Sequence, residues 1–519
     1  MTFPQPRFDR APPPRPHVVV IGAGVGGLAC AIRLGAAGHR VTLIERHRHA
    51  GGKIRTLDSA AGPVDAGPTV LTLRHVFDDL FASAGAHLDD HVTLVPQDIL
   101  ARHVWPDGAD LDLFADHERS AAAIRAFAGP RGEREFRAFC QRTRLLFETF
   151  DAPMMQAARP EPVQLAGHVL RRPRVFGPMA PHRSLAGLLR RQFSDPRLAQ
   201  LFGRYATYVG GAPLRAPAVL SLIWQAEAAG VWVVKGGMHK LAGAMAELAT
   251  ALGVEIRLGT DVDRIETHSG RASAVILKGG ARLRADAVVF NGDPRALACG
   301  ALGPACTKVA RQTLRIPRSF SARVYGFAAS PRGRALVHHN VFFAADPVAE
   351  FADLAAGRVP REPTLYLCAE DRGQGHNPPP VERFEIITNA PAAAGADTDE
   401  DLPQWHETIL QRMQRFNLTF TPEPSTTAIT TPRMFHRLFP GSEGALYGQS
   451  PHGMMAAFRR PTARTAVPGL YLAGGGTHPG AGVPMATLSG RHAAEAILND
   501  RISASTSVPT AMPGGMSTA

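Results

Sequence analysis

Residues 17–55 read HVVVIGAGVGGLACAIRLGAAGHRVTLIERHRHAGGKIR, and this stretch decides the fold. The β-branched run at 18–21 is typical of a strand that is buried on both faces. Good helix formers and apolar residues follow over 28–37, and a second apolar run at 41–44 ends at Glu45. Strand, helix and strand in this order predict the start of a Rossmann-like α/β domain.

The loop between the first strand and the helix satisfies G-x-G-x-x-G with Gly22, Gly24 and Gly27. The first glycine allows a tight turn, the second lets the backbone approach a pyrophosphate, and the third lets the helix pack close to the strand. Phosphates then lie at the helix N-terminus, where free N–H groups point at them. Glu45 has the spacing of an acid that accepts hydrogen bonds from ribose hydroxyls. The alternative is a glycine-rich turn without a ligand, and the register of strand, helix, strand and acid favours dinucleotide binding.

A glycine pair and two basic residues follow Glu45. Residues 51–56 read GGKIRT, and residues 65–69 read DAGPT. The glycines permit close backbone approach, and Lys53 with Arg55 can neutralise phosphate charge. This order of residues resembles the flavin-binding start of amine oxidases and carotenoid desaturases, so we expect FAD rather than NAD. An ordinary basic loop is the alternative.

The length and the net charge of the chain limit the number of its domains and the classes of its partners. A chain of 519 residues exceeds one simple core and predicts two intertwined domains. The net charge of +12 suits nucleic acid, anionic lipid or an acidic cofactor. Because the sequence contains no zinc-finger spacing and no aromatic-basic RNA-binding motif, we expect no nucleic-acid partner.

Cysteine spacing and terminal composition indicate the compartment. The five cysteines show no C-x-x-C spacing, which favours reduced thiols in a cytoplasmic protein and predicts no metal site. Residues 1–16 are rich in proline and arginine without the apolar core of a signal peptide, and residues 503–519 are rich in Ser, Thr, Pro and Gly. Both ends are predicted to be flexible tails. No apolar run is long enough to span a bilayer, so any membrane contact is expected to be peripheral.

The pattern between the tails predicts a discontinuous cofactor domain with an α+β domain inserted into it. The predicted FAD-binding domain comprises 17–100, 229–294 and 458–502, and the predicted substrate- and membrane-facing domain comprises 101–228 and 295–457. Within the inserted domain, 171–204 carries eight arginines and one acid, with Leu185, Leu188, Leu189 and Phe193 at helical spacing. This stretch is either a basic amphipathic helix on anionic lipid or a solvated face over an ordinary core stripe.

The last ordered block, 469–485, reads GLYLAGGGTHPGAGVPM. A strand that runs into glycines, followed by a helix to about Asn499, predicts a second backbone cradle beside the first.

With these motifs, the chain resembles the carotenoid desaturases of the phytoene-desaturase superfamily over nearly everything between the tails. The motifs are residues 22–27, DAGPT at 65–69, GGM at 236–238 and the block 476–485. Several stretches resemble one branch, the 1-hydroxycarotenoid 3,4-desaturases (hydroxyneurosporene or methoxyneurosporene dehydrogenases) of phototrophic bacteria. These stretches are 203–211, 221–227, 444–455 and 472–490.

The resemblance implies roles for particular residues. The ADP half of FAD would be held by Gly22, Ala23, Gly24, Val25, Gly26, Gly27 and Glu45. The pyrophosphate and the ribityl chain would run along Gly51, Gly52 and Lys53. The isoalloxazine would lie near Pro68 and Thr69, and the adenine near Val262. Backbone groups for the ribityl chain and the ring would come from Gly475, Gly476 and Met485. Lys53 stands where the family often has arginine, which keeps the charge without a bidentate fork. The closing strand also lacks the acid that many flavoproteins of this type carry there.

The implied reaction removes a hydride from one saturated carbon of an acyclic carotenoid and a proton from its neighbour, with the flavin as hydride acceptor. No catalytic side chain can be assigned, and His452 and His478 are interpreted as structural. The electron acceptor is expected to be a quinone or oxygen, and the location cytoplasmic, peripheral to the inner or photosynthetic membrane. Alternatives are phytoene desaturation, carotenoid isomerisation, a flavin-binding protein without turnover, and an amine oxidase, against which residues 477–484 speak.

Overall fold

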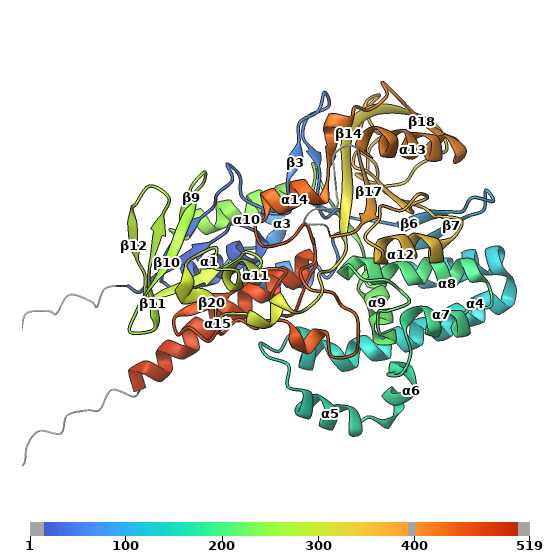
Figure 1. Ribbon diagram of the computed structural model, residues 1–519. Coiled ribbons are helices and arrows are strands. Elements are labelled where there is room, and N and C mark those ends of the chain that lie inside the picture. Colours follow the sequence, from blue (N-terminus) through green and yellow to red (C-terminus); the bar gives the residue numbers. More distant parts are fainter. Residues whose placement is uncertain (1–14, 393–400, 507–519) are drawn as a thin grey trace, which may run out of the picture.

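The computed structural model describes residues 15–392 and 401–506, whose arrangement Figure 1 shows. The tails predicted at 1–16 and 503–519 lie for the most part outside these residues. The C-terminal helix, α15 (Val483–Thr506), continues past Asn499, where the sequence predicted its end.

The N-terminal stretch forms the centre of a five-stranded sheet. The strand order is β20-β13-β1-β2-β9, and every pairing is parallel. The strands are β1 (His17–Ile21), β2 (Arg40–Ile44), β9 (Glu255–Arg257), β13 (Ala287–Phe290) and β20 (Leu470–Leu472). The predicted Rossmann-like α/β class is confirmed.

Alternate residues of β1 enter two different cores. Val18 and Val20 pack among helices on one face of the sheet, whereas Val19 and Ile21 pack against a small antiparallel sheet on the other face. Burial on both faces explains the unbroken β-branched run. The helices are α1 (Val25–Ala36), α10 (His239–Ala251) and α15, and the small sheet consists of β10 (Val262–His268), β11 (Arg271–Leu277) and β12 (Arg282–Arg284).

Helix α1 begins at Val25, earlier than the predicted start at residue 28, because the glycine loop itself forms the first turn. Gly24 is the extended N-cap residue, with φ −69° and ψ 166°. The first N–H groups of α1 therefore face the end of β1, where the phosphate site is predicted.

The second domain is built on an eight-stranded sheet with the order β18-β14-β17-β16-β15-β6-β7, in which β19 pairs with β14. Its longest strand, β14, was not predicted because its sequence SARVYGFAASPRG is rich in Ala, Gly and Ser. The strands are β6 (Ile99–Val104), β7 (Asp110–Phe114), β14 (Ser321–Gly333), β15 (His339–Phe342), β16 (Leu365–Ala369), β17 (Glu382–Ala390), β18 (Leu418–Thr421) and β19 (Ile429–Thr430). Since β6 crosses the predicted domain limit at residue 100, the limits themselves stay a prediction.

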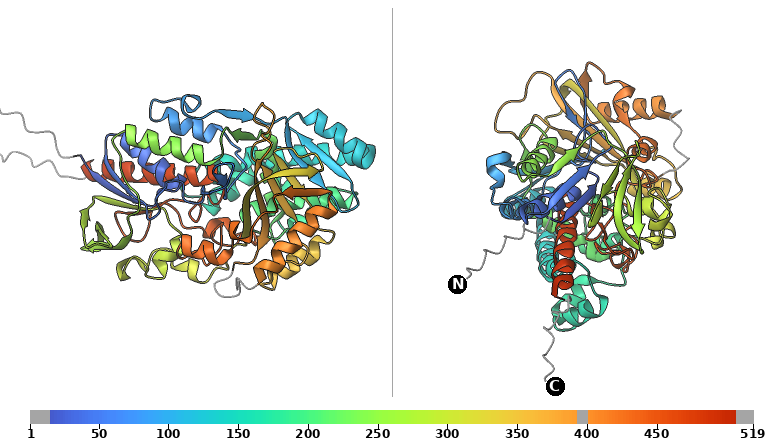
Figure 2. Two further views of the ribbon diagram at one scale, coloured as in Figure 1. Left: turned by 90° about the horizontal axis from the view of Figure 1, so that it is seen from above. Right: turned by 90° about the vertical axis from the view of Figure 1, so that its left-hand side faces the viewer.

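The two faces of this sheet have different partners. On one face, Phe327, Phe384 and Ile386 pack against Trp405 and other residues of α13 (Leu402–Arg415). The opposite face looks toward the cofactor domain and a group of helices (Figure 2). These helices are α4 (His117–Phe150), α7 (Leu185–Gln192), α8 (Pro196–Gly203) and α9 (Ile223–Ala228).

The basic stretch 171–204 is a solvated face over a core stripe. Leu185, Leu188, Leu189 and Phe193 are all buried, with at most 4% of each residue exposed. The interpretation of the helix at 185–193 as a lipid-facing amphipathic helix is therefore wrong, because its apolar side is already covered by the protein.

The remaining elements connect the two domains or cover them. The short strands are β3 (Thr56–Leu57), β4 (Val64–Asp65), β5 (Leu94–Pro96) and β8 (Trp232–Val234). The remaining α-helices are α2 (His75–Ala82), α3 (Leu88–His91), α5 (Pro162–Leu170), α6 (Phe176–Met179), α11 (Pro294–Ala298), α12 (Pro347–Ala355) and α14 (Pro432–Leu438).

Replacing Gly27 by alanine is expected to destabilise the protein by about 3 kcal/mol or more. A Cβ atom at this position would lie 2.1 Å from the carbonyl oxygen of Gly22, which is backbone and cannot rotate away. Gly243→Ala on α10 is the matched control, because its Cβ would meet nothing within 4 Å beyond its chain neighbours and the backbone of its own helix. That variant should gain about 0.5–1 kcal/mol. Thermal unfolding of both variants measures the difference, and equal stability would contradict close packing at Gly27.

Candidate active site

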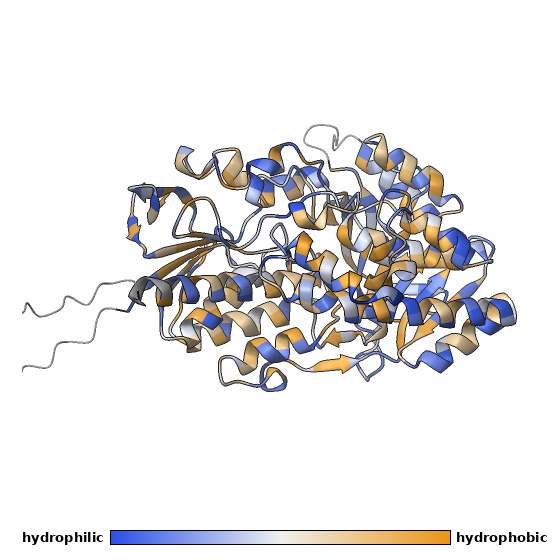
Figure 3. Ribbon diagram, turned by 90° about the horizontal axis from the view of Figure 1, so that it is seen from below, coloured by the Kyte–Doolittle hydropathy of each residue, from blue (hydrophilic) through white to orange (hydrophobic). Residues whose placement is uncertain are grey.

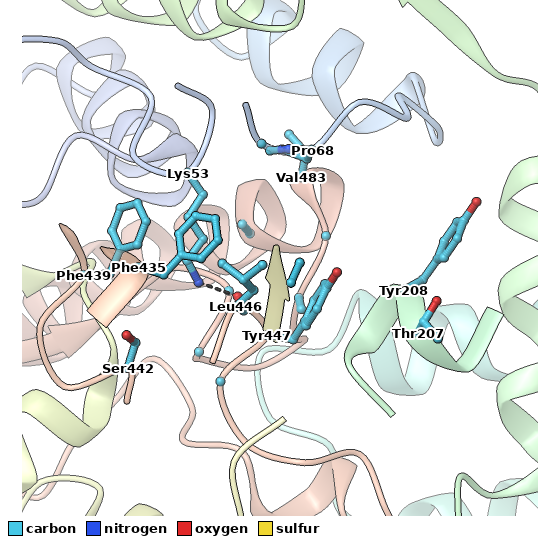
Figure 4. Close-up of a pocket in the computed structure, with 18 of the residues that line it drawn as sticks. Lys53, Pro68, Thr207, Tyr208, Phe435, Phe439, Ser442, Leu446, Tyr447 and Val483 are labelled. Atoms are coloured by element: carbon cyan, nitrogen blue, oxygen red, sulfur yellow. Dashed lines mark hydrogen bonds between the residues drawn. The ribbon is translucent and has the colours of Figure 1, made fainter. Parts of the chain in front are cut away.

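A cavity of about 1070 Å³ lies between the two domains. Its walls come from the glycine loops of the cofactor domain, from the inner face of the eight-stranded sheet and from α7 and α8. Figure 4 shows Lys53 and Leu446 on one side, Thr207 and Tyr208 on the other, and Tyr447 between them.

Most of the predicted site residues line this cavity. They are Gly22, Gly24, Val25, Gly26, Glu45, Gly51, Gly52, Lys53, Pro68, Thr69, Val262, Gly475 and Gly476. Three predicted residues do not line it: Ala23, Gly27 and Met485. Ala23 and Gly27 are buried, and the neighbours of Met485, Pro484 and Ala486, line the cavity instead of it.

The two glycine motifs meet directly. The N–H of Gly51 donates to the carbonyl of Ala23 at 2.8 Å. A Cβ atom on Gly52 would lie 3.0 Å from the Cα of Gly24. Side chains at these positions would therefore fill the space between the loops, and only glycine leaves the backbone bare on the cavity side.

Glu45 is held in place by the backbone. Its carboxylate accepts from the N–H of Ala23 at 2.7 Å and from the N–H of His47 at 2.9 Å. The residue is 5% exposed and lies at the cavity wall, at the end of β2. These two backbone donors fix the orientation of the carboxylate and leave its remaining lone pairs for the hydroxyl groups of a ribose.

Asn291 completes the glycine loop and was missed in the sequence. Its side-chain Nδ2 donates to the carbonyls of Gly22 (3.1 Å) and Gly24 (3.3 Å), and its buried Oδ1 has no partner among the described residues. The signal that could have found it is its position, since polar residues at the carboxyl ends of parallel strands lie where such sheets bind ligands.

Lys53 reaches across the cavity wall to the second domain. Its ammonium donates to the carbonyl of Leu446 and lies 5.6 Å from the ring centre of Phe439. The pKa of Lys53 is lowered to about 8, mainly by burial; Asp293 opposes this shift, and Arg318 and Arg460 add to it. A buried cation beside two arginines is poised to receive an anion.

Two rows of side chains cross the inner face of the large sheet. The first row is Val324, Ile387, Tyr366 and Val341, which are register neighbours and all line the cavity. The second row, on the same face, is Gly326, Glu385, Cys368 and His339. The first row gives the cavity a largely apolar floor, and the second supplies buried polar groups beside it.

The tyrosine of the first row links the two domains. The hydroxyl of Tyr366 lies 2.7 Å from Oγ1 of Thr69 and 2.6 Å from Nδ1 of His339. Burial lowers the pKa of His339 well below its usual value, so the imidazole is neutral. Burial, with Glu370 and Asp65, raises the pKa of Glu385 well above its usual range, so this carboxyl group is protonated.

His338, His339 and Cys368 have ligand atoms within 4.8 Å of one another, the arrangement of a possible metal site. His338 pairs instead with the carbonyl of Arg372 (2.7 Å) and with the sulfur of Cys368 (3.4 Å). Burial raises the pKa of Cys368 well above its usual value, which keeps the thiol protonated. That the chain holds no metal stays a prediction.

The motif histidines have structural partners. His478 pairs with the carbonyl of Ala157 at 2.9 Å, and His452 accepts from the N–H of Ala212 at 2.9 Å. Neither lines the cavity. These contacts agree with a structural role, which stays a prediction.

The sequence matches the flavin-containing amine oxidoreductase family over residues 25–323 and 395–498, and the chain belongs to this family. Its cofactor is therefore a flavin, and the protein is a flavin-dependent oxidoreductase. The bare backbone of the glycine loops and the N-terminus of α1 fit the phosphate groups of such a cofactor.

The relatives that share about half of their residues with this chain are named as desaturases. The hydroxyneurosporene desaturase of Cereibacter sphaeroides is 55% identical over 94% of this chain and 99% of that protein. The enzyme of the same name from Rhodobacter capsulatus is 51% identical over 94% of this chain and 98% of that protein. An oxidoreductase structure from Methanosarcina mazei shares the fold, with a TM-score of 0.61 and 17% identity over 93% of this chain and 100% of that chain. The expected membership of the carotenoid desaturases is confirmed.

Flavin affinity is expected to depend on the charge of Lys53. With a pKa of about 8, its ammonium is present below that pH and is lost above it. The affinity for the anionic flavin should therefore fall as the pH rises from about 7 to about 9.5, by up to about tenfold for each unit above 8. Fluorescence titration of the apoprotein with flavin measures this dependence.

Lys53→Arg is the control, because arginine stays charged over this range. Its affinity should stay level. A fall of the same size in the variant would mean that another group causes the dependence.

Proposed function

We propose that the protein is an FAD-dependent desaturase that forms a C=C bond at C-3,4 of an acyclic, 1-hydroxylated carotenoid. The observation that carries the proposal is a single cavity that runs from the glycine loops to the apolar row of the large sheet. The relatives named hydroxyneurosporene desaturase support this substrate class.

The geometry suits removal of hydrogen from a polyene. Bound FAD supplies a hydride acceptor. The row of Val324, Ile387 and Val341 offers flat apolar contact along an extended chain and excludes water from it. Loss of hydride beside a polyene leaves a delocalised cation whose neighbouring proton is acidic, so the reaction needs no strong base in the wall.

The electron acceptor is proposed to be a quinone or oxygen. The motif that would hold a nicotinamide is absent from the sequence, since G-x-G-x-x-G followed by strand and acid occurs once, at residues 22–27.

Purified protein reconstituted with FAD should convert 1-hydroxyneurosporene with a red shift of its visible absorption, because the new double bond extends the conjugation. Phytoene offered under the same conditions should stay unchanged. Conversion of phytoene alone would replace the proposal by phytoene desaturation. Isomerisation without a spectral red shift, or retention of FAD without turnover of either substrate, would also overturn it.

We also propose that the protein is cytoplasmic and docks peripherally on the inner or photosynthetic membrane, where its substrate dissolves. Within residues 15–392 and 401–506, none of the helices offers an apolar stretch that would cross a bilayer, and polar and apolar residues mix along the helices in Figure 3.

The docking element is proposed to be the lobe of α5 and α6, which projects from the body (Figures 1 and 2). Val163 and Leu170 share one face of α5 and are 85% and 68% exposed. Arg171, Arg172 and Arg174, all exposed, follow directly. Exposed apolar side chains beside several cations match an anionic lipid surface.

Val163→Ser combined with Leu170→Ser should lower binding to phosphatidylglycerol vesicles by about tenfold or more, because each apolar side chain contributes about 1.5–3 kcal/mol when buried. Leu258→Ser, at an equally apolar but distant exposed position, is the control and should bind like the parent. Co-sedimentation measures binding, and phosphatidylcholine vesicles should bind less of all three proteins. An unchanged bound fraction in the double variant would remove the lobe from the membrane contact.

A further inference from the structure

We propose that Arg204 and Tyr208 form a subsite that binds the terminal hydroxyl group of the carotenoid substrate. The inference rests on the proposed function and adds the chemical feature by which the cavity selects its substrate. Both residues belong to the 3-10 segment Arg204–Val209 and line the cavity.

The two side chains are part of a buried cluster around Glu227. The carboxylate accepts from Tyr208 at 2.8 Å, from Tyr205 at 2.9 Å and from Arg204 at 3.2 Å. Arg204 also donates to the hydroxyl oxygen of Tyr208 at 2.7 Å. Glu227 is 2% exposed and Arg204 is 9% exposed.

A buried ion pair in the wall of an apolar cavity is costly. Desolvation of the two charges offsets most of their attraction, and apolar residues of the same size often stabilise a protein equally well. Protein stability alone therefore does not account well for a charged cluster at this position. A ligand that forms hydrogen bonds with the unpaired groups of the cluster accounts for it better.

The free groups match an alcohol. The Nε of Arg204 is a buried donor without a hydrogen-bond partner among the described residues. The hydroxyl of Tyr208 donates to Glu227 and accepts from Arg204, which leaves one lone pair of its oxygen unused. A hydroxyl group both donates and accepts hydrogen bonds, so it complements a donor and an acceptor that lie side by side. A substrate with a hydrocarbon end would leave the donor of Arg204 unpaired.

The position suits the expected reaction. Tyr208, Val70 and Tyr366 pack against the same core, and Tyr366 bonds to Thr69, which the family resemblance places near the isoalloxazine. A hydroxyl on C-1 lies only a few bonds from C-3 and C-4. The group that binds it must therefore lie on the same side of the cavity as Tyr366, and Tyr208 is among the groups whose charge acts on the Tyr366 hydroxyl and raises its pKa, after the larger effect of burial.

The test compares two tyrosine variants in the flavin-loaded protein. Tyr208→Phe should lower the ratio of kcat/KM for 1-hydroxyneurosporene to kcat/KM for the same polyene without the hydroxyl by about ten- to hundredfold. Tyr205→Phe loses the same kind of bond to Glu227, but Tyr205 is fully buried and does not line the cavity. It should keep the ratio of the parent. Equal changes in both variants, or no change in Tyr208→Phe, would overturn the subsite.

A binding measurement separates this inference from the reaction. Quenching of protein fluorescence by the two carotenoids in detergent micelles should show that the parent binds the hydroxylated one more tightly, and that Tyr208→Phe does not. This holds even if no double bond forms, in which case the proposed reaction fails and the subsite stands. Equal affinity of the parent for both carotenoids overturns the subsite whatever the activity is.

Discussion

The structure depends on a close approach of backbone segments around Asn291. The loop at 22–27, the Gly51–Gly52 pair and the turn at 474–476 come together there with almost no side chains between them. A Cβ atom on Gly26 would lie 2.7 Å from Oδ1 of Asn291 and 2.8 Å from the N–H of Gly474. Packing at this density tolerates no added methyl group, because two of the three nearest atoms are backbone. The bare backbone that results is also the surface that a dinucleotide needs.

Close backbone contact also fixes the position of helix α15 relative to helix α1. A Cβ atom on Gly490 of α15 would lie 2.2 Å from the carbonyl of Gly26 in α1, so the two helices touch backbone to backbone. The first residues of helix α15 line the cavity, and the N-terminus of α1 forms the predicted phosphate site. The cofactor cradle and the far wall of the cavity are thus placed by one contact, which explains why residues more than 400 positions apart in the sequence form one site.

The second domain buries polar side chains next to a cavity that is largely apolar. Glu385, His339 and Tyr366 lie in neighbouring rows of one sheet face, and burial leaves the acid protonated and the imidazole neutral. Arg204 and Glu227 instead form a buried pair, with 3.2 Å between the guanidinium and the carboxylate. Groups of this kind cost free energy when buried, and Tyr366 and Arg204 bring two of these polar clusters to the cavity wall.

Much of the cofactor half could be predicted from the sequence, because its signals are local. The run at 18–21, the glycines at 22–27 and Glu45 lie within one βαβ unit. In such a unit the spacing of residues along the chain determines where they lie relative to one another. Asn291 could not be found in this way, since its role depends on which strand pairs with β1. Strand β14 was missed because burial, not propensity, makes its small residues extended.

The sequence by itself determined the class of fold, the flavin-binding motif and the resemblance to the carotenoid desaturases, since each follows from short-range residue order. Only the tertiary structure decided that the apolar stripe at 185–193 is core and not a lipid-binding face. It also decided that Arg204, Tyr208 and Glu227 meet at the cavity wall. The physical reason is that burial and hydrogen bonding between distant segments are properties of packed surfaces, and residue order along one segment does not contain them.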